Sequence, residues 1–120
     1  DCFTILHLLH TYNPQHVFIE KQQAMPRQGV SSTFRTGFGY GLYIGMLIAG
    51  DYDYTIVGAK EWKKYFNLSS DKDLSREKAS VIFPDASHMW RQKNQDGLAE
   101  AALIAYFGAN GSQVLSSLQQ

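Results

Sequence analysis

Residues 17–47 read VFIEKQQAMPRQGVSSTFRTGFGYGLYIGML, and this stretch decides the fold. Residues His16–Glu20, which overlap the start of this stretch, form a short and mostly apolar run. This run predicts a buried strand that ends at a carboxylate. A polar loop with a proline and a glycine follows, and Ser31 or Ser32 can cap a long helix that runs to about Ala49. A buried strand followed by a loop and a long helix is typical of an α/β layer fold.

Glycines recur at a fixed spacing within this predicted helix, at Gly37, Gly41 and Gly45, with Gly39 in addition. Each glycine costs about 1 kcal/mol in a helix interior, so three at one spacing indicate a structural reason. We expect a flat stripe on one face of the helix, which another helix or the sheet can approach closely. The bulky apolar residues on its other faces indicate that part of this helix meets a second copy of the chain.

The rest of the chain continues the alternation of helices and short strands. A second strand is predicted over Tyr54–Val57, and further helices over Cys2–Tyr12, Gly58–Phe66, Leu74–Phe83 and Asn94–Phe107, the last capped by Gly108. Two strands make a poor sheet, and the chain begins with Asp1 rather than Met, so we expect the first strands to be missing. The prediction is one domain over residues 1–111, incomplete at its N-terminus, and a polar tail over residues 112–120.

Composition excludes few functions. The net charge is zero, which argues weakly against nucleic-acid binding, because proteins that bind nucleic acid are usually basic. The basic and acidic residues are, however, segregated along the chain. The single cysteine, Cys2, cannot form an internal disulfide, and no signal peptide or stretch of membrane-spanning length is visible, so a cytoplasmic protein is expected. The glycines lack the context of a phosphate-binding loop, and no Ser-His-Asp or Cys-His site can be assembled from the spacings.

Three carboxylates stand out by position. Glu20 ends a predicted strand, where functional groups gather in open α/β sheets. Asp96 and Glu100 are four residues apart on the last predicted helix, so they share a face and lie roughly 6 Å apart. A divalent cation such as Mg²⁺, which takes oxygen ligands, would remove their repulsion. Position alone leaves simpler interpretations open: Glu20 as an ordinary strand-end charge, and Asp96 as an acid favoured by the helix dipole.

Four motifs resemble those of bacterial and phage RuvC-like Holliday junction resolvases. The first is residues 17–47, a strand ending in Ile-Glu, a loop with Met-Pro and Gln-Gly, a serine, and a helix with repeated glycines. VGAKEWKKYF resembles the family's strand followed by a Trp-Lys-Lys helix, REKASVIFP its next helix, and DGLAEAALIAYFG its last. The four motifs occur in the same order as in the family, and together they cover about Val17–Gly108.

The resemblance implies an RNase H-like fold with a mixed central sheet flanked by helices, and a homodimer. It also implies Mg²⁺- or Mn²⁺-dependent hydrolysis of branched DNA in recombination and repair, in a bacterial or phage-infected cell, with carboxylates as metal ligands. Glu20 matches the family's catalytic glutamate, and Asp96 and Glu100 match an acidic pair that is often two aspartates at closer spacing. The family's remaining ligand, an aspartate on its first strand, has no counterpart in this sequence, so we expect this chain by itself to lack part of the catalytic site.

Basic residues would contact the phosphates of the DNA, which positions it without reading its sequence. The candidates are Lys21, Arg27, Arg35, Lys60, Lys63 and Lys64. Two other functions stay open: a non-catalytic module for junction binding or dimerisation, and another RNase H-like nuclease of the transposase type.

Overall fold

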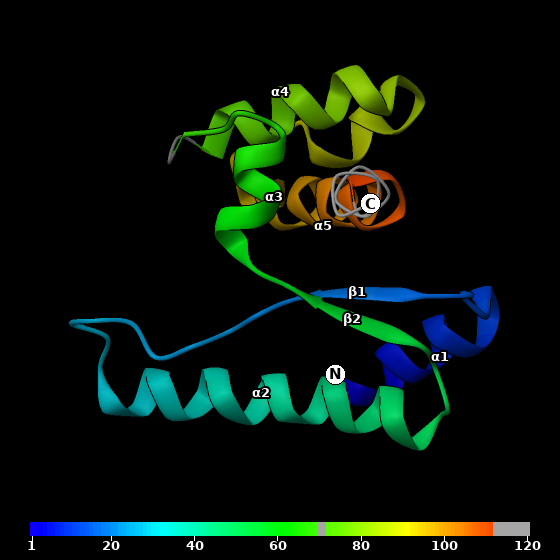
Figure 1. Cartoon of the computed structure of the whole chain (residues 1–120), viewed down its shortest axis with the longest axis vertical. Helices are drawn as coiled ribbons and strands as arrows, with labels where there is room; N and C mark the ends of the chain where they lie inside the picture. The colour runs from blue at the N-terminus through cyan, green and yellow to red at the C-terminus, as the bar shows by residue number, and fades with distance from the viewer. Residues whose placement is uncertain (70–71, 112–120) are drawn as a thin grey trace, which may run out of the picture. The chain divides into compact units, whose positions relative to one another are not determined.

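The computed structural model describes residues 1–69 and 72–111, so the predicted polar tail lies outside the described residues. The elements (Figure 1) are α1 (Cys2–Tyr12), β1 (Val17–Glu20), α2 (Val30–Ala49), β2 (Tyr54–Val57), α3 (Ala59–Tyr65), α4 (Lys72–Ile82), η1 (Pro84–Trp90), η2 (Lys93–Gln95), α5 (Asp96–Tyr106) and η3 (Phe107–Gly111). Contacts divide the chain into two compact units, Asp1–Ile56 and Val57–Gln120. The single domain over residues 1–111 stays a prediction.

The first unit contains a β–α–β crossover. The N–H of Val17, the first residue of β1, donates to the carbonyl of Asp53, just before β2, at 2.9 Å. Because the beginnings of the two strands are paired, β1 and β2 run parallel, and α2 carries the chain back between them (Figure 1). Glu20 is the last residue of β1 and therefore lies at the carboxyl edge of this two-stranded sheet.

The long helix α2 ends at Ala49, as predicted, but its predicted cap is wrong. The helix begins at Val30 after Gly29, which makes no side-chain capping hydrogen bond, so Ser31 and Ser32 lie inside the first turn. The Ser32 hydroxyl instead accepts a hydrogen bond from the Gln28 side-chain amide at 3.1 Å. Glycine is itself an acceptable N-cap residue, so the helix can start two or three residues earlier than a serine cap would place it.

The glycine stripe of α2 is open. A Cβ atom built at Gly37, Gly39, Gly41 or Gly45 would meet no atom within 4 Å. Among the residues that the structure describes, no atom packs on this stripe, so the predicted close approach of another helix or of the sheet is not made within the chain. The stripe instead forms the floor of a groove of about 530 Å³, lined by Gly37, Phe38, Gly41, Leu42, Gly45, Met46 and Ala49.

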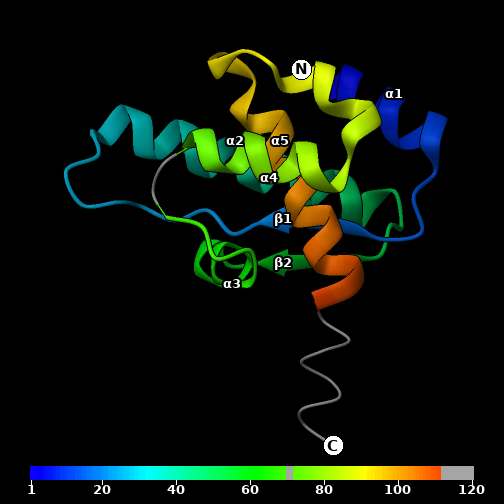
Figure 2. The same cartoon turned by 90° about the horizontal axis from the view of Figure 1, so that it is seen from above.

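The second unit is helical and holds most of the buried apolar side chains. The α5 helix packs across α4 (Figure 2), and Ala99, Leu103, Ile104 and Phe107 are buried at the helical spacing of one face. Trp62 of α3 and Leu103 of α5 are each 0% exposed. The Phe66 and Tyr106 rings, with centroids 6.1 Å apart, extend this core.

The ends of α5 differ from the prediction. The helix starts at Asp96, because a 3₁₀ turn, η2, with a reciprocal Gln92–Gln95 capping box takes up the residues before it. Its C-cap is Phe107 rather than Gly108, since Gly108 lies in the π-helical turn η3 that continues the chain. Within the part of the chain that the structure describes, no helix has the length and apolar character needed to cross a membrane.

Candidate functional site

Glu20 lines a pocket between the end of β1 and the middle of α2. The side chain is half-buried, and the Gln22 amide nitrogen lies 3.4 Å from its Oε1 atom. The pocket has a volume of about 310 Å³ and is lined by Ile19, Glu20, Gln22, Arg35, Thr36, Gly39, Tyr40 and Tyr43. The carboxylate that the sequence singled out therefore faces a hollow that contains an arginine and two tyrosines, which is a setting suited to a charged ligand.

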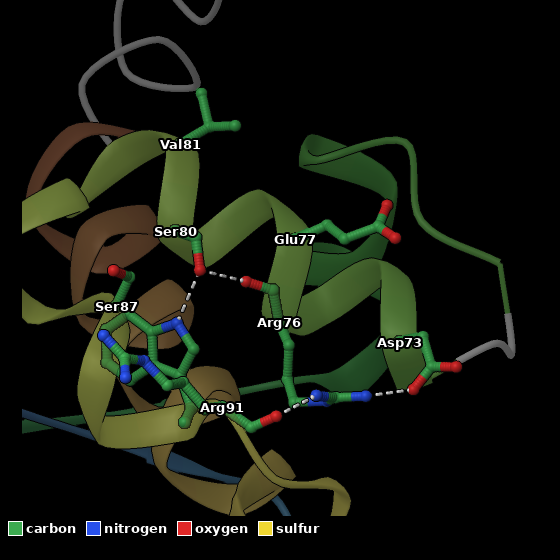
Figure 3. Close-up of a pocket in the computed structure, with 8 residues that line it drawn as sticks. Asp73, Arg76, Glu77, Ser80, Val81, Ser87 and Arg91 are labelled. Atoms are coloured by element: carbon green, nitrogen blue, oxygen red, sulfur yellow. Dashed lines mark hydrogen bonds and ion pairs between the residues drawn. The ribbon is translucent and has the colours of Figure 1, made fainter.

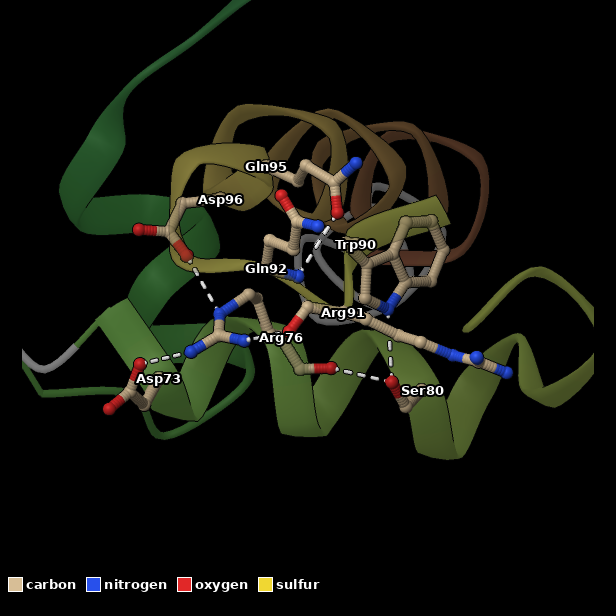
Figure 4. Close-up of polar contacts among 8 residues, drawn as sticks. All are labelled: Asp73, Arg76, Ser80, Trp90, Arg91, Gln92, Gln95 and Asp96. Carbon is tan, nitrogen blue, oxygen red and sulfur yellow. Dashed lines mark hydrogen bonds and ion pairs between the residues drawn. The ribbon is translucent and has the colours of Figure 1, made fainter. Parts of the chain in front are cut away.

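Asp96 is the first residue of α5 and forms an ion pair with Arg76 of α4 (Figure 4). The Arg76 Nε atom lies 2.9 Å from Asp96 Oδ1. Both atoms are buried, and their alignment is not that of a hydrogen bond, since neither has a hydrogen-bond partner among the described residues. The side chains are 17% and 18% exposed, so this ion pair is only partly accessible to water.

The other nitrogens of the Arg76 guanidinium are also engaged. Nη1 donates to the carbonyl of Arg91 at 2.9 Å, and Nη2 donates to the carboxylate of Asp73. The hydrogen bond with Asp73 raises the pKa of Arg76, burial lowers it, and the negative charges of Asp73 and Asp96 raise it further. The net shift in the pKa is upward, so Arg76 carries its positive charge at neutral pH.

A second pocket lies beside this network (Figure 3). It has a volume of about 690 Å³ and is lined by Asp73, Arg76, Glu77, Ser80, Val81, Ser87, Trp90 and Arg91. The indole N–H of Trp90 donates to the Ser80 hydroxyl at 2.9 Å, and that hydroxyl donates to the carbonyl of Arg76 at 2.9 Å. Sequence reasoning missed this network. The one local signal was the spacing of Asp73, just before the helix predicted over Leu74–Phe83, and Arg76, three residues further on.

The acidic pair on α5 fits a hard cation in donor type. Asp96 and Glu100 are both half-buried, and carboxylate oxygens are the ligands that Mg²⁺ takes. Protein sites commonly hold Mg²⁺ through one or two carboxylates together with water and phosphate oxygens. Across residues 1–69 and 72–111, no cluster of three or more His, Cys, Asp or Glu side chains is gathered that could hold a metal ion. Glu20 belongs to the first unit and the pair to the second, so their convergence on one ion stays a prediction.

Three of the predicted DNA-contacting residues lie in the first unit. Lys21 and Arg27 are exposed in the loop between β1 and α2, and Arg27 has a positive φ of 67°. Arg35 is exposed on α2 and lines the same pocket as Glu20. Of these three residues, the structure places Arg35 beside the predicted catalytic glutamate.

The other three form the basic cluster of α3. Lys60 and Lys64 are exposed, whereas Lys63 is half-buried. The Lys63 ammonium lies 5.6 Å from the centre of the buried Trp62 ring, a cation–π contact. The two exposed lysines are therefore better placed than Lys63 for contact with a phosphate.

No family model and no curated protein matches this chain. Among solved structures it is similar to RuvC of Thermus thermophilus, with a TM-score of 0.65 and 16% identity, over 92% of this chain and 66% of that one. It is also similar to T. thermophilus RuvC in complex with a Holliday junction substrate, with a TM-score of 0.60 and 18% identity over the same shares of the two chains. At such identities the likeness shows the fold alone. The chain thus has a RuvC-like α/β fold, as the sequence predicted, and spans 66% of the length of those RuvC chains.

Proposed function

We propose that this protein is a structure-selective endodeoxyribonuclease that hydrolyses Holliday junctions or related branched DNA in recombination and repair. The observation that carries the proposal is the RuvC-like fold over 92% of the chain, since one RuvC structure that it resembles holds a Holliday junction substrate. Because one fold can host unrelated functions, the proposal also depends on the site residues. We also propose that the RuvC-like α/β fold of this chain is RNase H-like.

In this proposal, Glu20, Asp96 and Glu100 hold Mg²⁺ or Mn²⁺. The bound cation supplies Lewis-acid chemistry, by stabilising charge on the attacking and leaving oxygens of a phosphodiester. The three side chains act as ligands through their negative charge and do not attack the phosphorus themselves. Two features support these roles: Glu20 lines a pocket at the carboxyl edge of the sheet, and the other two acids share a face of α5.

The basic residues would hold the DNA backbone near this site. Arg35 lines the same pocket as Glu20, so a phosphate bound by its guanidinium would lie close to that carboxylate. Lys21 and Arg27 on the neighbouring loop, with Lys60 and Lys64 on α3, would add contacts that position the duplex arms. Such contacts make affinity strongly dependent on salt.

A second copy of the chain is the proposed partner of α2. Leu47 is the one buried residue of this 20-residue helix, whereas Phe38 and Leu42 are 62% and 38% exposed. The open glycine stripe lets the backbone of another helix approach closely, as small residues do in other helix pairs. A two-fold contact would place the same stripe on both partners, and the four arms of a junction would then meet two equivalent sites.

The test is cleavage of a four-way junction by the product of the complete gene, with a linear duplex of the same sequence as the comparison substrate. With Mg²⁺ present, the junction should be cut and the duplex left intact. Glu20→Gln, which keeps the side-chain shape and removes its charge, should abolish cutting and retain junction binding. Glu61→Gln, on the exposed face of α3, is the matched control and should cut at the parental rate. Cutting by Glu20→Gln at the parental rate would remove Glu20 from the site.

One observation favours a second candidate, a module that binds junctions without cutting them. Asp96 has a protein cation as its partner, and the described residues do not gather three metal-ligating side chains. A binding module predicts selective junction binding that needs no divalent cation and is accompanied by no cleavage. The nuclease predicts cleavage that requires one.

A further inference from the structure

We infer that Arg76 is a positioning residue for Asp96: it fixes one carboxylate oxygen in place and leaves the other directed outward as the oxygen available to a divalent cation. This inference rests on the proposed function, in which Asp96 is a metal ligand. It adds a residue of α4 to the site, outside the predicted set of carboxylates and DNA-binding residues.

The two oxygens of Asp96 have different surroundings. Oδ1 is buried and lies 2.9 Å from the Arg76 Nε atom, so the guanidinium occupies the space next to it. Figure 4 shows the other oxygen, Oδ2, pointing away from Arg76. Because the side chain is 18% exposed while Oδ1 is buried, the accessible surface lies on its remaining atoms. With Oδ1 buried against Arg76, Oδ2 is the carboxylate oxygen that remains for a ligand.

Arg76 is held firmly enough to set this orientation. Its guanidinium contacts three elements at once: Asp73 within α4, the carbonyl of Arg91 after η1, and Asp96 at the start of α5. A planar guanidinium presents its donors in a fixed fork, so these contacts leave it little freedom to turn. The Asp96 carboxylate is restrained in turn by its buried ion pair with this anchored cation, at 2.9 Å from Nε. Residues that orient a metal ligand in this way typically contribute 10- to 100-fold to metal affinity.

A competing effect acts in the opposite direction, because a guanidinium repels a cation bound to the same carboxylate. Asp73 counters this repulsion, since its carboxylate contacts the same guanidinium. Asp73, Arg76 and Asp96 together carry one net negative charge, from two carboxylates and one guanidinium. The group as a whole therefore attracts a divalent cation, and the loss of orientation should dominate when Arg76 is replaced.

The experiment is a Mn²⁺ titration of the full 120-residue chain, followed by paramagnetic broadening of backbone amide NMR signals in α5. Arg76→Gln should raise the apparent dissociation constant for Mn²⁺ about tenfold or more. Arg76→Lys keeps the charge but has no planar fork, so it should weaken binding as well. The matched control is Arg91→Gln, which removes the same charge from the same pocket and keeps the carbonyl that Arg76 contacts. Its affinity should stay close to the parental value.

The outcomes separate the inference from the proposed function. If the parent binds Mn²⁺ at α5 and Arg76→Gln binds as tightly or more tightly, Arg76 is a competing counter-ion and the inference is wrong, while the metal site stands. If Mn²⁺ broadens no α5 signal of the parent, the proposed metal site fails and the inference fails with it. If Arg76→Gln does not fold, which its amide spectrum would show, the charge-conserving Arg76→Lys decides the question.

Discussion

Replacing Gly41 by leucine should strengthen the helix in a single chain and weaken the association of two. In the chain by itself, a Cβ at Gly41 meets nothing within 4 Å, so the added side chain has room. Leucine is favoured over glycine in a helix interior by about 0.8 kcal/mol, so the variant monomer should be more stable by roughly that amount. The added leucine would fill the groove that Phe38, Leu42 and Met46 line.

In a dimer whose two α2 helices contact each other through their glycine stripes, the same substitution should be destabilising. Overpacking a tight contact costs about 1–3 kcal/mol, and a two-fold contact contains the substituted residue twice. The association of two variant chains should therefore lose roughly 2–6 kcal/mol. Since 1.4 kcal/mol corresponds to a factor of ten, the dissociation constant of the dimer should rise by about 30-fold at the least.

Sedimentation of the parent and the variant across a dilution series measures the association, and urea unfolding measures the stability of the chain. Gly39→Ala is the control, since Gly39 lies about 200° around the helix from Gly41 and its Cβ also meets open space. It should gain helix stability and associate as the parent does. A parent that is monomeric at every concentration would refute the dimer, and a Gly41→Leu variant that associates like the parent would refute the contact through the stripe.

Two other predictions concern the core and the DNA interface. Leu103→Ala, at a side chain that is 0% exposed, should lower the free energy of unfolding by about 2–5 kcal/mol in urea. Val81→Ala, at a side chain that is 78% exposed, should change it by less than about 0.5 kcal/mol, and similar losses at both positions would contradict the assigned core. Arg35→Gln should weaken junction binding and reduce the slope of log affinity against log salt by about one. An unchanged slope would mean that Arg35 makes no phosphate contact.

The elements of the crossover in the first unit could be predicted from the sequence because their signals are local. The apolar run before Glu20 and the Tyr54–Val57 run gave both strands, and the periodic residues between them gave the end of α2 at Ala49. The cap of α2 could not be predicted in the same way. The Ser32 hydroxyl can hydrogen-bond to several partners, and here it accepts from the Gln28 side chain.

In the candidate site, too, the local features could be predicted and the contacts between residues distant in sequence could not. The position of Glu20 at a strand end and the spacing of Asp96 and Glu100 on one helix are local features, and the structure has both. The Arg76 network depends on the packing of α4 against α5, which brings together residues 15 and 20 positions apart in the sequence. Periodicity does not specify such a contact. The open stripe is a similar case, because the glycine spacing predicted a close approach without saying whether the partner would be the same chain or another.

The central proposal is that Glu20 shares a divalent-cation site with Asp96 and Glu100, and a Mn²⁺ titration of three variants tests it most directly. The variants are Glu20→Gln, Asp96→Asn and the double substitution. If one ion is shared, Mn²⁺ should broaden amide signals at the end of β1 and at the start of α5 over the same concentration range. Each single variant should then weaken both effects, and the double variant should lose less affinity than the two single losses combined. Broadening confined to one of these segments, or losses that simply add, would contradict a shared metal site.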